Sequence, residues 1–319
     1  MVNYVRSAAV ILISFLFFLT IFFSFVAFGT KEIKQFVSPL IRNEKVLGEN
    51  VWFPKIAEGS DSNAPLINAK AAIFVDSKTG KVLYSKSAQE RLPIASLAKV
   101  MAVLIALEHK GMDDNYIVSQ RATEMEPDEM ILLAGEALTL KELLYGIFLV
   151  SANDAAEVLA EGSLPARLVS DGSERAGRQE FINLMNAKAG QLGMKDTHFV
   201  NPTGLDEDIG SSISSAYDMA ILTRYLIRKY PEIVEISKTP YIFIPETDTH
   251  QSYEMYSGIN LLTSYPGVAG FKTGYTPEAG FTLITLARKD GHEVIGVLLD
   301  SPYRRDEAKE LLDYSFAKL

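Results

Sequence analysis

Apolar runs typical of β-strands lie near both ends of the globular part of this chain, and helical patterns fill the stretch between them. Short runs occur at 71–75 and 81–85, and longer ones at 281–289 and 293–300. From about 112 to 270, apolar residues recur mostly at helical spacing. Strands at both ends with helices between favour a mixed α/β fold of the α+β kind, in which one antiparallel sheet is split by a helical insertion.

The amino-terminal segment predicts a membrane tether. Residues 8–28 carry no charge, and about 20 apolar residues suffice to span a bilayer as a helix. A cleaved signal peptide usually has a shorter apolar core of ~7–15 residues. We therefore expect residues 1–28 to form an uncleaved signal-anchor that holds the protein at the cell membrane as a single-pass protein. The alternative is a secreted enzyme released by cleavage after the apolar run.

The composition excludes several classes of function. The chain has 319 residues and a formal net charge of -9, whereas nucleic-acid binding needs a basic face. It contains no cysteine, so disulfides, thiolate catalysis and cysteine metal sites are ruled out. Its four histidines are widely spaced, and we expect neither a metal nor a cofactor. Residues 29–66 show no sustained periodicity and are predicted to be a linker before a globular domain at 67–319.

The first candidate catalytic pair is Ser96 and Lys99, at the start of an apolar stretch that predicts a buried helix over 96–110. Residues three apart share a helix face, so the lysine amine can reach the serine hydroxyl. A serine nucleophile needs a partner that takes its proton, and a lysine can do so only when neutral. Burial and the positive end of a helix both disfavour the charged amine.

The second candidate element is Ser151-Ala152-Asn153, which interrupts two helical patterns directly after an apolar run. A hydroxyl and an amide two residues apart in such a turn can both project into one cleft. Taken alone, this tripeptide is equally explained by serine and asparagine acting as helix caps.

The tripeptide Lys-Thr-Gly occurs twice, at 78–80 and at 272–274. The first copy lies at a polar tip between two short strands, where Gly80 is free to adopt a positive φ, and it is predicted to be a hairpin turn. The second copy follows an apolar run and precedes a long strand, so it is predicted to lie on a strand of the sheet. There Lys272 and Thr273 offer a cation and a hydroxyl to a carboxylate, and Gly274 allows close approach to the backbone.

Ser-x-x-Lys, Ser-x-Asn and Lys-Thr-Gly in this order resemble the signature of the penicillin-recognising serine acyl enzymes. The stretches PIASLAKVMAVLIALE, LLYGIFLVSANDAAEVLAE, FINLMNAKAGQLGMKDTHFVNPTGLD and GFKTGYTPEAGFTLITLARKDG narrow the resemblance to serine D-Ala-D-Ala carboxypeptidases, the low-molecular-mass penicillin-binding proteins. The resemblance covers roughly residues 67–319. It implies an antiparallel five-stranded sheet flanked by helices, of the β-lactamase/transpeptidase type.

The resemblance also implies catalytic roles. Ser96 is expected to be the nucleophile and Lys99 its general base. Ser151 is expected to relay a proton to the leaving amine, and Asn153 to hold the substrate amide. The implied substrates are peptidoglycan stem peptides that end in D-Ala-D-Ala, and β-lactams are the implied covalent inhibitors.

For substrate binding, the resemblance implies that Lys272 and Thr273 contact the terminal carboxylate, beside Gly274. The backbone N–H of Tyr275 is expected to complete an oxyanion hole with that of Ser96. Arg304 aligns with an arginine that helps to receive the carboxylate, and Arg305 is its rival, because only the register of the last helix separates them.

The sequence departs from this family in two respects. Tyr275 stands where many relatives have histidine, which puts a side-chain role at this position in doubt. Many relatives also continue into a β-rich domain and a carboxyl-terminal amphipathic anchor, which the amino-terminal segment is expected to replace as tether.

Three alternative functions compete with the carboxypeptidase. A DD-endopeptidase would cut peptidoglycan crosslinks with the same site. A β-lactamase is disfavoured, because no Glu-x-x-Leu-Asn run lies between the second and third motifs. A non-catalytic cell-wall-binding module is disfavoured, because every motif side chain is present.

Overall fold

A computed structural model of the chain describes residues 54, 63–165 and 174–319. The predicted anchor over 8–28 and nearly all of the predicted linker over 29–66 lie outside these residues. Among the described helices, none combines the length and the apolar composition that crossing a membrane requires.

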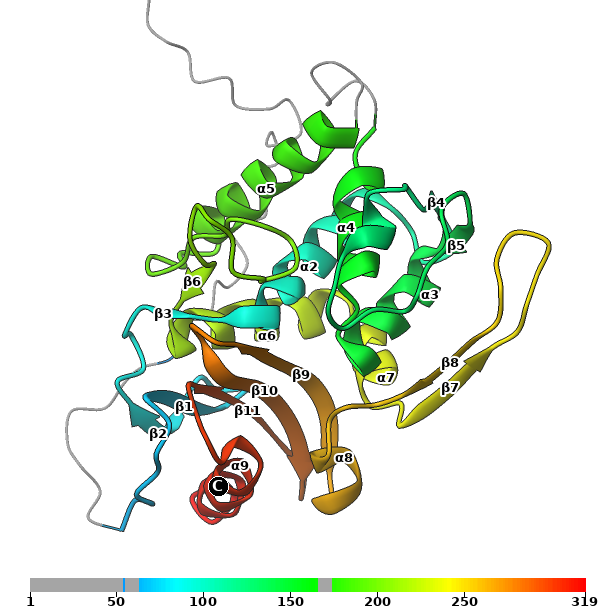
Figure 1. Cartoon of the computed structure of the whole chain (residues 1–319). Coiled ribbons are helices and arrows are strands. Elements are labelled where there is room, and N and C mark those ends of the chain that lie inside the picture. Colours follow the sequence, from blue (N-terminus) through cyan, green and yellow to red (C-terminus); the bar gives the residue numbers. More distant parts are fainter. Residues whose placement is uncertain (1–53, 55–62, 166–173) are drawn as a thin grey trace, which may run out of the picture. The chain divides into compact units, whose positions relative to one another are not determined.

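A five-stranded antiparallel sheet forms the centre of the fold, as predicted (Figure 1). The strand order is β2-β1-β11-β10-β9, so the first strands of the domain pair with the last. In the register between β1 and β11, for example, Ile73 lies opposite Val297. The strands are β1 (Ala71–Asp76), β2 (Val82–Lys86), β9 (Val268–Thr276), β10 (Gly280–Lys289) and β11 (His292–Leu299).

Helices cover both faces of the sheet, which explains why β1 is buried along its whole length. Side chains such as Ile73 and Ile284 point into the larger core, shared with most of the helices. Their neighbours Phe74 and Leu283 point into a smaller core against the last helix, α9 (Arg304–Phe316). Figure 1 shows α9 on one side of the sheet and α6 on the other. Consecutive residues of the strands thus stabilise different layers.

The segment between β2 and β9 holds the remaining helices and three two-stranded pairs of short strands, β3-β6, β4-β5 and β7-β8. Side chains cap two of these helices: Thr139 and Glu142 form a capping box, and the Ser215 hydroxyl accepts a hydrogen bond from the Asp218 amide. The helices are α2 (Lys99–His109), α3 (Leu140–Tyr145), α4 (Asn153–Gly162), α5 (Glu174–Gln191), α6 (Ala216–Lys229), α7 (Glu232–Ser237) and α8 (Leu261–Ser264). The short strands are β3 (Leu92–Pro93), β4 (Asn115–Ile117), β5 (Ala137–Thr139), β6 (Ile213–Ser214), β7 (Tyr241–Ile244) and β8 (Tyr253–Tyr256).

The first Lys-Thr-Gly copy forms the turn between β1 and β2, as predicted. Thr79 donates from its amide to the Asp76 carboxylate at 2.6 Å, and Gly80 has a φ of 78°. Lys78 and Thr79 are exposed at this tip. The Asp76 side chain therefore organises a turn that does not belong to a binding site.

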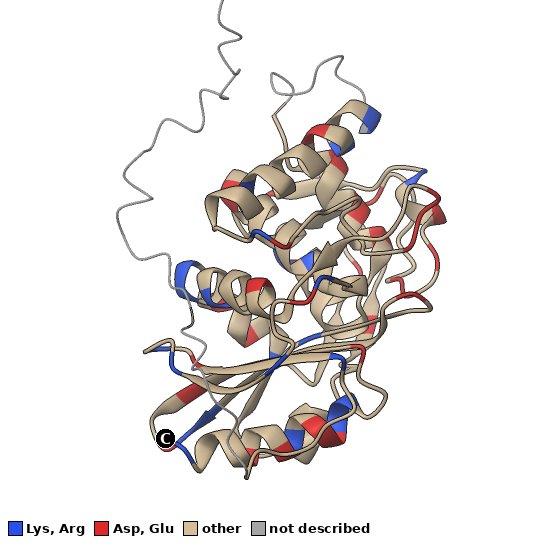
Figure 2. Cartoon of the chain, turned by 90° about the vertical axis from the view of Figure 1, so that its left-hand side faces the viewer, with Lys and Arg blue, Asp and Glu red and all other residues tan. Residues whose placement is uncertain are grey.

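Charged residues of both signs are mixed on the outer surface of the described part. Figure 2 shows acidic and basic residues interspersed along α9. Arg305 and Asp306 form an exposed ion pair there, at 3.1 Å. Such a mixture is typical of a solvated helix face.

Candidate functional site

Ser96 lies in a tight turn immediately before helix α2, and not at its first residue as the sequence predicted. Residues Ala95–Ala98 form a 3₁₀ turn, and α2 begins at Lys99. The backbone of Ala95 has a φ of 48°, and the Leu97 amide donates to the Ile94 carbonyl oxygen at 3.2 Å, which is the three-residue bond of a 3₁₀ turn. In a 3₁₀ turn residues three apart eclipse each other, so Ser96 and Lys99 still share a face.

Two glycines allow the Ser96 turn to pack closely between a loop and the sheet. A Cβ on Gly204 would lie 1.9 Å from the Ala95 carbonyl oxygen. A Cβ on Gly274 would lie 2.9 Å from the Ser96 amide nitrogen and 2.6 Å from Thr282 Oγ1. The close approach at Gly274 is thus to the protein's own nucleophile turn, which lies directly against the second Lys-Thr-Gly segment on β9.

The amine of Lys99 is completely buried and has three polar neighbours. Its Nζ lies 2.8 Å from Ser96 Oγ, 2.7 Å from Asn153 Oδ1 and 2.7 Å from the backbone oxygen of Thr203. The last two atoms only accept hydrogen bonds. A neutral amine has two hydrogens and one lone pair, so with both hydrogens given to these acceptors its lone pair points to the Ser96 hydroxyl.

The electrostatic setting of Lys99 favours this neutral form. Burial lowers the pKa of its amine to about 7, although the carboxylates of Asp128, Glu157 and Asp154 oppose the shift. Desolvation penalises the ammonium form more than these charges stabilise it. A substantial fraction of Lys99 can therefore accept a proton at neutral pH.

A second lysine-serine pair faces the same region. Ser151 follows a π-helical turn at Gly146–Val150 and has a φ of 64°. The Lys272 amine, on β9, donates to Ser151 Oγ and to the Thr273 carbonyl oxygen, each at 2.7 Å. The break between two helices predicted at this position is therefore present. It presents the hydroxyl to the strand that carries the second Lys-Thr-Gly copy.

Lys272 is almost fully buried. Burial lowers its pKa well below that of an ordinary lysine, and repulsion from Lys99 adds to the effect. An arriving carboxylate would offset both costs by pairing with the ammonium form.

Asn153 contacts the first of these pairs from the first turn of helix α4. Its Oδ1 accepts from Lys99, while its Nδ2 donates to the backbone oxygen of Pro127. This second contact fixes the orientation of the amide, so the oxygen faces the lysine. The backbone amide of Asn153 is also held, by the Asp128 carbonyl oxygen at 2.7 Å.

The remaining predicted residues lie around the end of β9. Thr273 is partly buried and lines a cavity of about 40 Å³ together with Asn260, Leu283 and Arg304. Tyr275 is 55% exposed, and its ring packs on that of Phe281 at a centroid distance of 4.7 Å.

Arg304 and Arg305 differ in their contacts. The Arg304 guanidinium donates to the backbone oxygen of Gly274 at 2.6 Å and to that of Thr282 at 3.1 Å. Arg305 also borders the cavity, but its guanidinium pairs with Asp306 on the exposed surface of α9. Arg304 is thus the arginine that is fixed to the Lys-Thr-Gly strand.

Sequence reasoning assigned no role to the loop at 201–205, which contributes directly to the site. Thr203 supplies the carbonyl oxygen that accepts from Lys99. Asn201 shapes the loop, because its Oδ1 accepts from the Gly204 amide at 2.6 Å. The Asn-Pro-Thr-Gly series is a turn signal, but a backbone carbonyl that acts on a distant lysine has no signature of its own.

Comparison with protein families identifies the chain. The sequence profile described as D-alanyl-D-alanine carboxypeptidase, a family of serine peptidases, matches residues 58–303. The chain belongs to this family. The D-alanyl-D-alanine carboxypeptidase family therefore accounts for the domain that carries all three motifs.

Curated relatives bear names of this family and of a related activity. The chain is 38% identical over 258 residues to the D-alanyl-D-alanine carboxypeptidase DacF of Bacillus subtilis. The aligned region covers 78% of the chain and 62% of that protein. It thus spans less than two thirds of that relative. It is 32% identical to a D-alanyl-D-alanine endopeptidase of Pseudomonas aeruginosa, over 72% of the chain and 71% of the relative.

Solved structures of the family share the fold. A DD-transpeptidase from Streptomyces superposes with a TM-score of 0.73 at 28% identity, over 80% of this chain and 99% of that one. A D-alanyl-D-alanine carboxypeptidase from Mycobacterium tuberculosis gives a TM-score of 0.71 at 29% identity, over 82% and 96%.

Proposed function

We propose that this protein is a serine D-Ala-D-Ala carboxypeptidase that removes the terminal D-Ala of peptidoglycan stem peptides through an acyl-enzyme on Ser96. The observation that carries the proposal is the buried Lys99 amine, 2.8 Å from Ser96 Oγ, with its two other polar neighbours both acceptors. Such a lysine is a base directed at one hydroxyl. Membership of the family supports the same reaction.

In the acylation step, Ser96 Oγ attacks the carbonyl carbon of the scissile bond and its proton passes to Lys99. The oxyanion is stabilised by the backbone N–H groups of Ser96 and Tyr275. The Ser96 amide lies next to Gly274, the residue that precedes Tyr275. The peptide C–N bond then breaks, and the leaving amine of D-Ala takes a proton by way of Ser151. Water hydrolyses the ester and restores Ser96.

Lys272 and Thr273 bind the terminal carboxylate of the substrate. Arg304 supports the strand on which they lie, because its guanidinium donates to the Gly274 carbonyl oxygen. Pairing with the carboxylate stabilises the ammonium form of Lys272 against the cost of burial. β9 is the last strand in the order of the sheet, and an extended peptide can lie along such an edge. β-Lactams enter the same site and form the corresponding ester with Ser96.

Two measurements test the proposal. A fluorescent penicillin should label the purified protein covalently. A non-catalytic cell-wall-binding module would not be labelled. Mass analysis of uncrosslinked muropeptides with pentapeptide stems should show loss of one D-Ala. Absence of both the label and the shortened stem would refute the assignment.

A DD-endopeptidase is the second candidate, because one relative with 32% identity bears that name. Crosslinked muropeptides distinguish the two activities. Conversion of crosslinked dimers to monomers, with pentapeptide stems left intact, would identify an endopeptidase.

We also propose that residues 8–28 tether the enzyme in the cell membrane with the catalytic domain on the extracytoplasmic side. The length of this uncharged run supports the proposal, and so does a substrate that lies outside the cytoplasm.

A further inference from the structure

We propose that Arg178 is a positioning residue for the general base, because it links the two elements that hold the Lys99 amine. This inference rests on the proposed function. The two acceptors of Lys99 come from different parts of the chain: Asn153 Oδ1 from α4 and the Thr203 carbonyl from the loop at 201–205. The lone pair points to Ser96 only while these two oxygens keep their relative positions.

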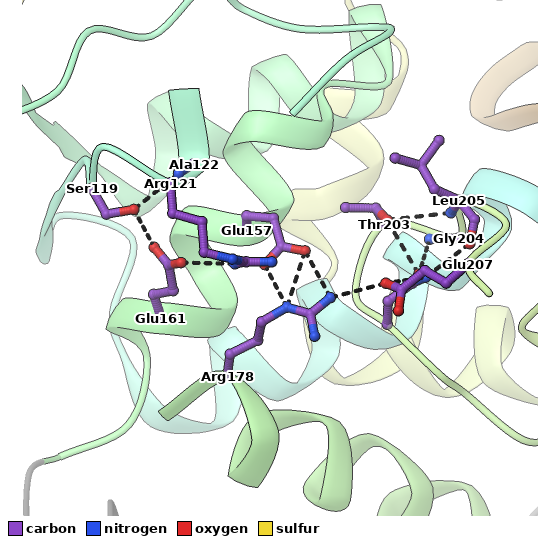
Figure 3. A network of polar contacts seen from close by, with 11 residues as sticks. Ser119, Arg121, Ala122, Glu157, Glu161, Arg178, Thr203, Gly204, Leu205 and Glu207 are labelled. Atoms are coloured by element: carbon purple, nitrogen blue, oxygen red, sulfur yellow. Dashed lines mark hydrogen bonds and ion pairs between the residues drawn. The ribbon is translucent and has the colours of Figure 1, made fainter. Parts of the chain in front are cut away.

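Figure 3 shows the connection between the two elements. Glu157 lies on α4 one turn after Asn153, and its side chain is fully buried. Arg178, from α5, donates hydrogen bonds to both carboxylate oxygens of Glu157 at 2.9–3.3 Å. Its Nη2 also donates to Glu207 Oε1 at 3.1 Å. The guanidinium therefore joins α4 to Glu207, which lies two residues after the loop at 201–205.

The contact continues from Glu207 to the Lys99 amine. The same Glu207 oxygen accepts from Asn201 Nδ2 at 2.9 Å. Asn201 Oδ1 in turn accepts from the Gly204 amide and from Thr203 Oγ1. This holds the peptide whose carbonyl accepts from Lys99. Glu157, Arg178, Glu207 and Asn201 thus form one continuous hydrogen-bonded strut between α4 and the loop.

Arg178 suits this task because its rigid fork binds two carboxylates in fixed directions. The Arg178 side chain is 17% exposed and Glu157 is fully buried, so their contact is only weakly screened by solvent. Glu207 is 35% exposed. Arg121 also pairs with Glu157, by one hydrogen bond of 2.8 Å, but its other partner is Glu161 on α4. Loss of Arg121 therefore removes an ion pair from Glu157 without releasing the loop, and the Glu207 variants test the loop side of Arg178 without changing Glu157.

The test is the rate of acylation by a fluorescent penicillin at saturating concentration, measured against pH. Misplacement of a catalytic group by about 1 Å can cost up to ~100-fold in rate, and we expect a loss of roughly 10-fold for Arg178→Gln and for Glu207→Leu. Arg121→Gln should stay within about 2-fold of the parent protein. Glu207→Gln keeps an acceptor oxygen for both donors and should retain most of the rate.

The shape of the pH profile separates positioning from electrostatics. The charged groups that act on Lys99 are Asp128, Asp154, Glu157 and Lys272. A change in their field alone would move the midpoint of the profile and leave the plateau at high pH, where Lys99 is neutral in every variant. Loss of the strut should lower the plateau itself.

The melting temperature of each of the four variants is measured first. Acylation rates are then compared at a temperature well below the lowest of these values, so that every variant is folded. The inference is overturned if Arg178→Gln and Arg121→Gln lower the plateau equally. It is also overturned if Glu207→Leu leaves the plateau unchanged, or if Glu207→Gln falls as far as Glu207→Leu. A parent protein that penicillin does not acylate would instead refute the proposed function.

Discussion

Lys99 and Lys272 each contact one serine hydroxyl, but their surroundings direct them to different tasks. Lys99 has two carbonyl acceptors that use its hydrogens, which leaves a lone pair for Ser96. Lys272 has Ser151 and one backbone oxygen as partners, which leaves capacity to donate to an anion. Two chemically identical side chains thus serve as base and as anion receptor because their hydrogen-bond partners differ.

Ser96→Ala should abolish covalent labelling by penicillin while the protein stays folded. The lost hydroxyl contacts only Lys99 among the side chains described around it, and the neutral amine keeps both of its acceptors. A hydrogen bond of this kind contributes about 0.5–1.5 kcal/mol to stability, so circular dichroism should show a native fold. A covalent adduct on the variant would mean that another residue is the nucleophile.

The acylation rate should rise with pH through a midpoint near the lowered pKa of Lys99, about 7. Below this pKa the amine is an ammonium ion and cannot take the serine proton. Above it, the neutral form dominates and the rate reaches a plateau. Stopped-flow measurements of acylation from pH 5.5 to 9.5 test this, and a midpoint close to 10 would contradict it.

Lys99→Arg should remove acylation at every pH in this range. A guanidinium keeps its proton under these conditions, so no base is present even where the parent protein reaches its plateau. An arginine variant that is acylated would show that another group accepts the proton from Ser96.

At the scale of elements, the same tripeptide does different work on a turn and on a strand. At the tip between β1 and β2, Thr79 contacts only its own turn. On β9, Thr273 borders the cavity near Arg304, and Gly274 adjoins the nucleophile turn. Position in the sheet therefore decides which copy can meet a ligand.

Thr79→Ala and Thr273→Ala form a matched pair of variants. The first should leave the acylation rate within about 2-fold, because the Thr79 side chain contacts only its own turn. The second should slow acylation and weaken the preference for ligands with a free carboxylate. Equal effects of the two substitutions on the rate and on this preference would disprove the division between turn and binding strand.

Gly274→Ala tests the contact between β9 and the nucleophile turn. The added methyl group would lie 2.9 Å from the Ser96 amide nitrogen, and this distance is too short for a carbon contact. Because the turn must move away, we expect acylation to fall by about 10-fold or more. An unchanged rate would show that the turn is not held in place by this contact.

At the scale of the whole molecule, the sheet brings the two ends of the domain together. β1 pairs with β11, and α9 packs on the face of the sheet opposite α2 and α4, the helices that follow Ser96 and Ser151. Arg304, near the end of the chain, thereby reaches the carbonyl of Gly274. The site is assembled from segments more than 200 residues apart.

The native protein is expected to keep residues 8–28 and to remain in the membrane fraction after washing with high salt, because apolar insertion is not screened by ions. A truncated protein that begins at Ala64 should be soluble and react fully with penicillin, since all three motifs lie beyond it. Amino-terminal sequencing of the native protein decides between anchor and cleaved signal. A start near Gly29 would contradict the anchor.

The sequence by itself determined most of the elements and the candidate site residues. Apolar runs and helical spacing located four of the strands and the long helices, because burial on one face of a helix or strand repeats at a fixed spacing. The motifs indicated Ser96 with Lys99, the turn at 151–153 and the strand at 272–274, and the flanking residues distinguished the two Lys-Thr-Gly copies.

Tertiary structure decided what depends on contacts between distant segments. α2 starts at Lys99 and not at Ser96, because residues Ala95–Ala98 form a 3₁₀ turn, and this turn lies directly against Gly204. The choice of Arg304 over Arg305 as the arginine fixed to β9 followed from the seating of α9 on the sheet. The sequence could not predict the roles of the Thr203 carbonyl and of the strut. Every residue carries the same backbone carbonyl, and only the folded chain places this one within hydrogen-bond distance of the Lys99 amine.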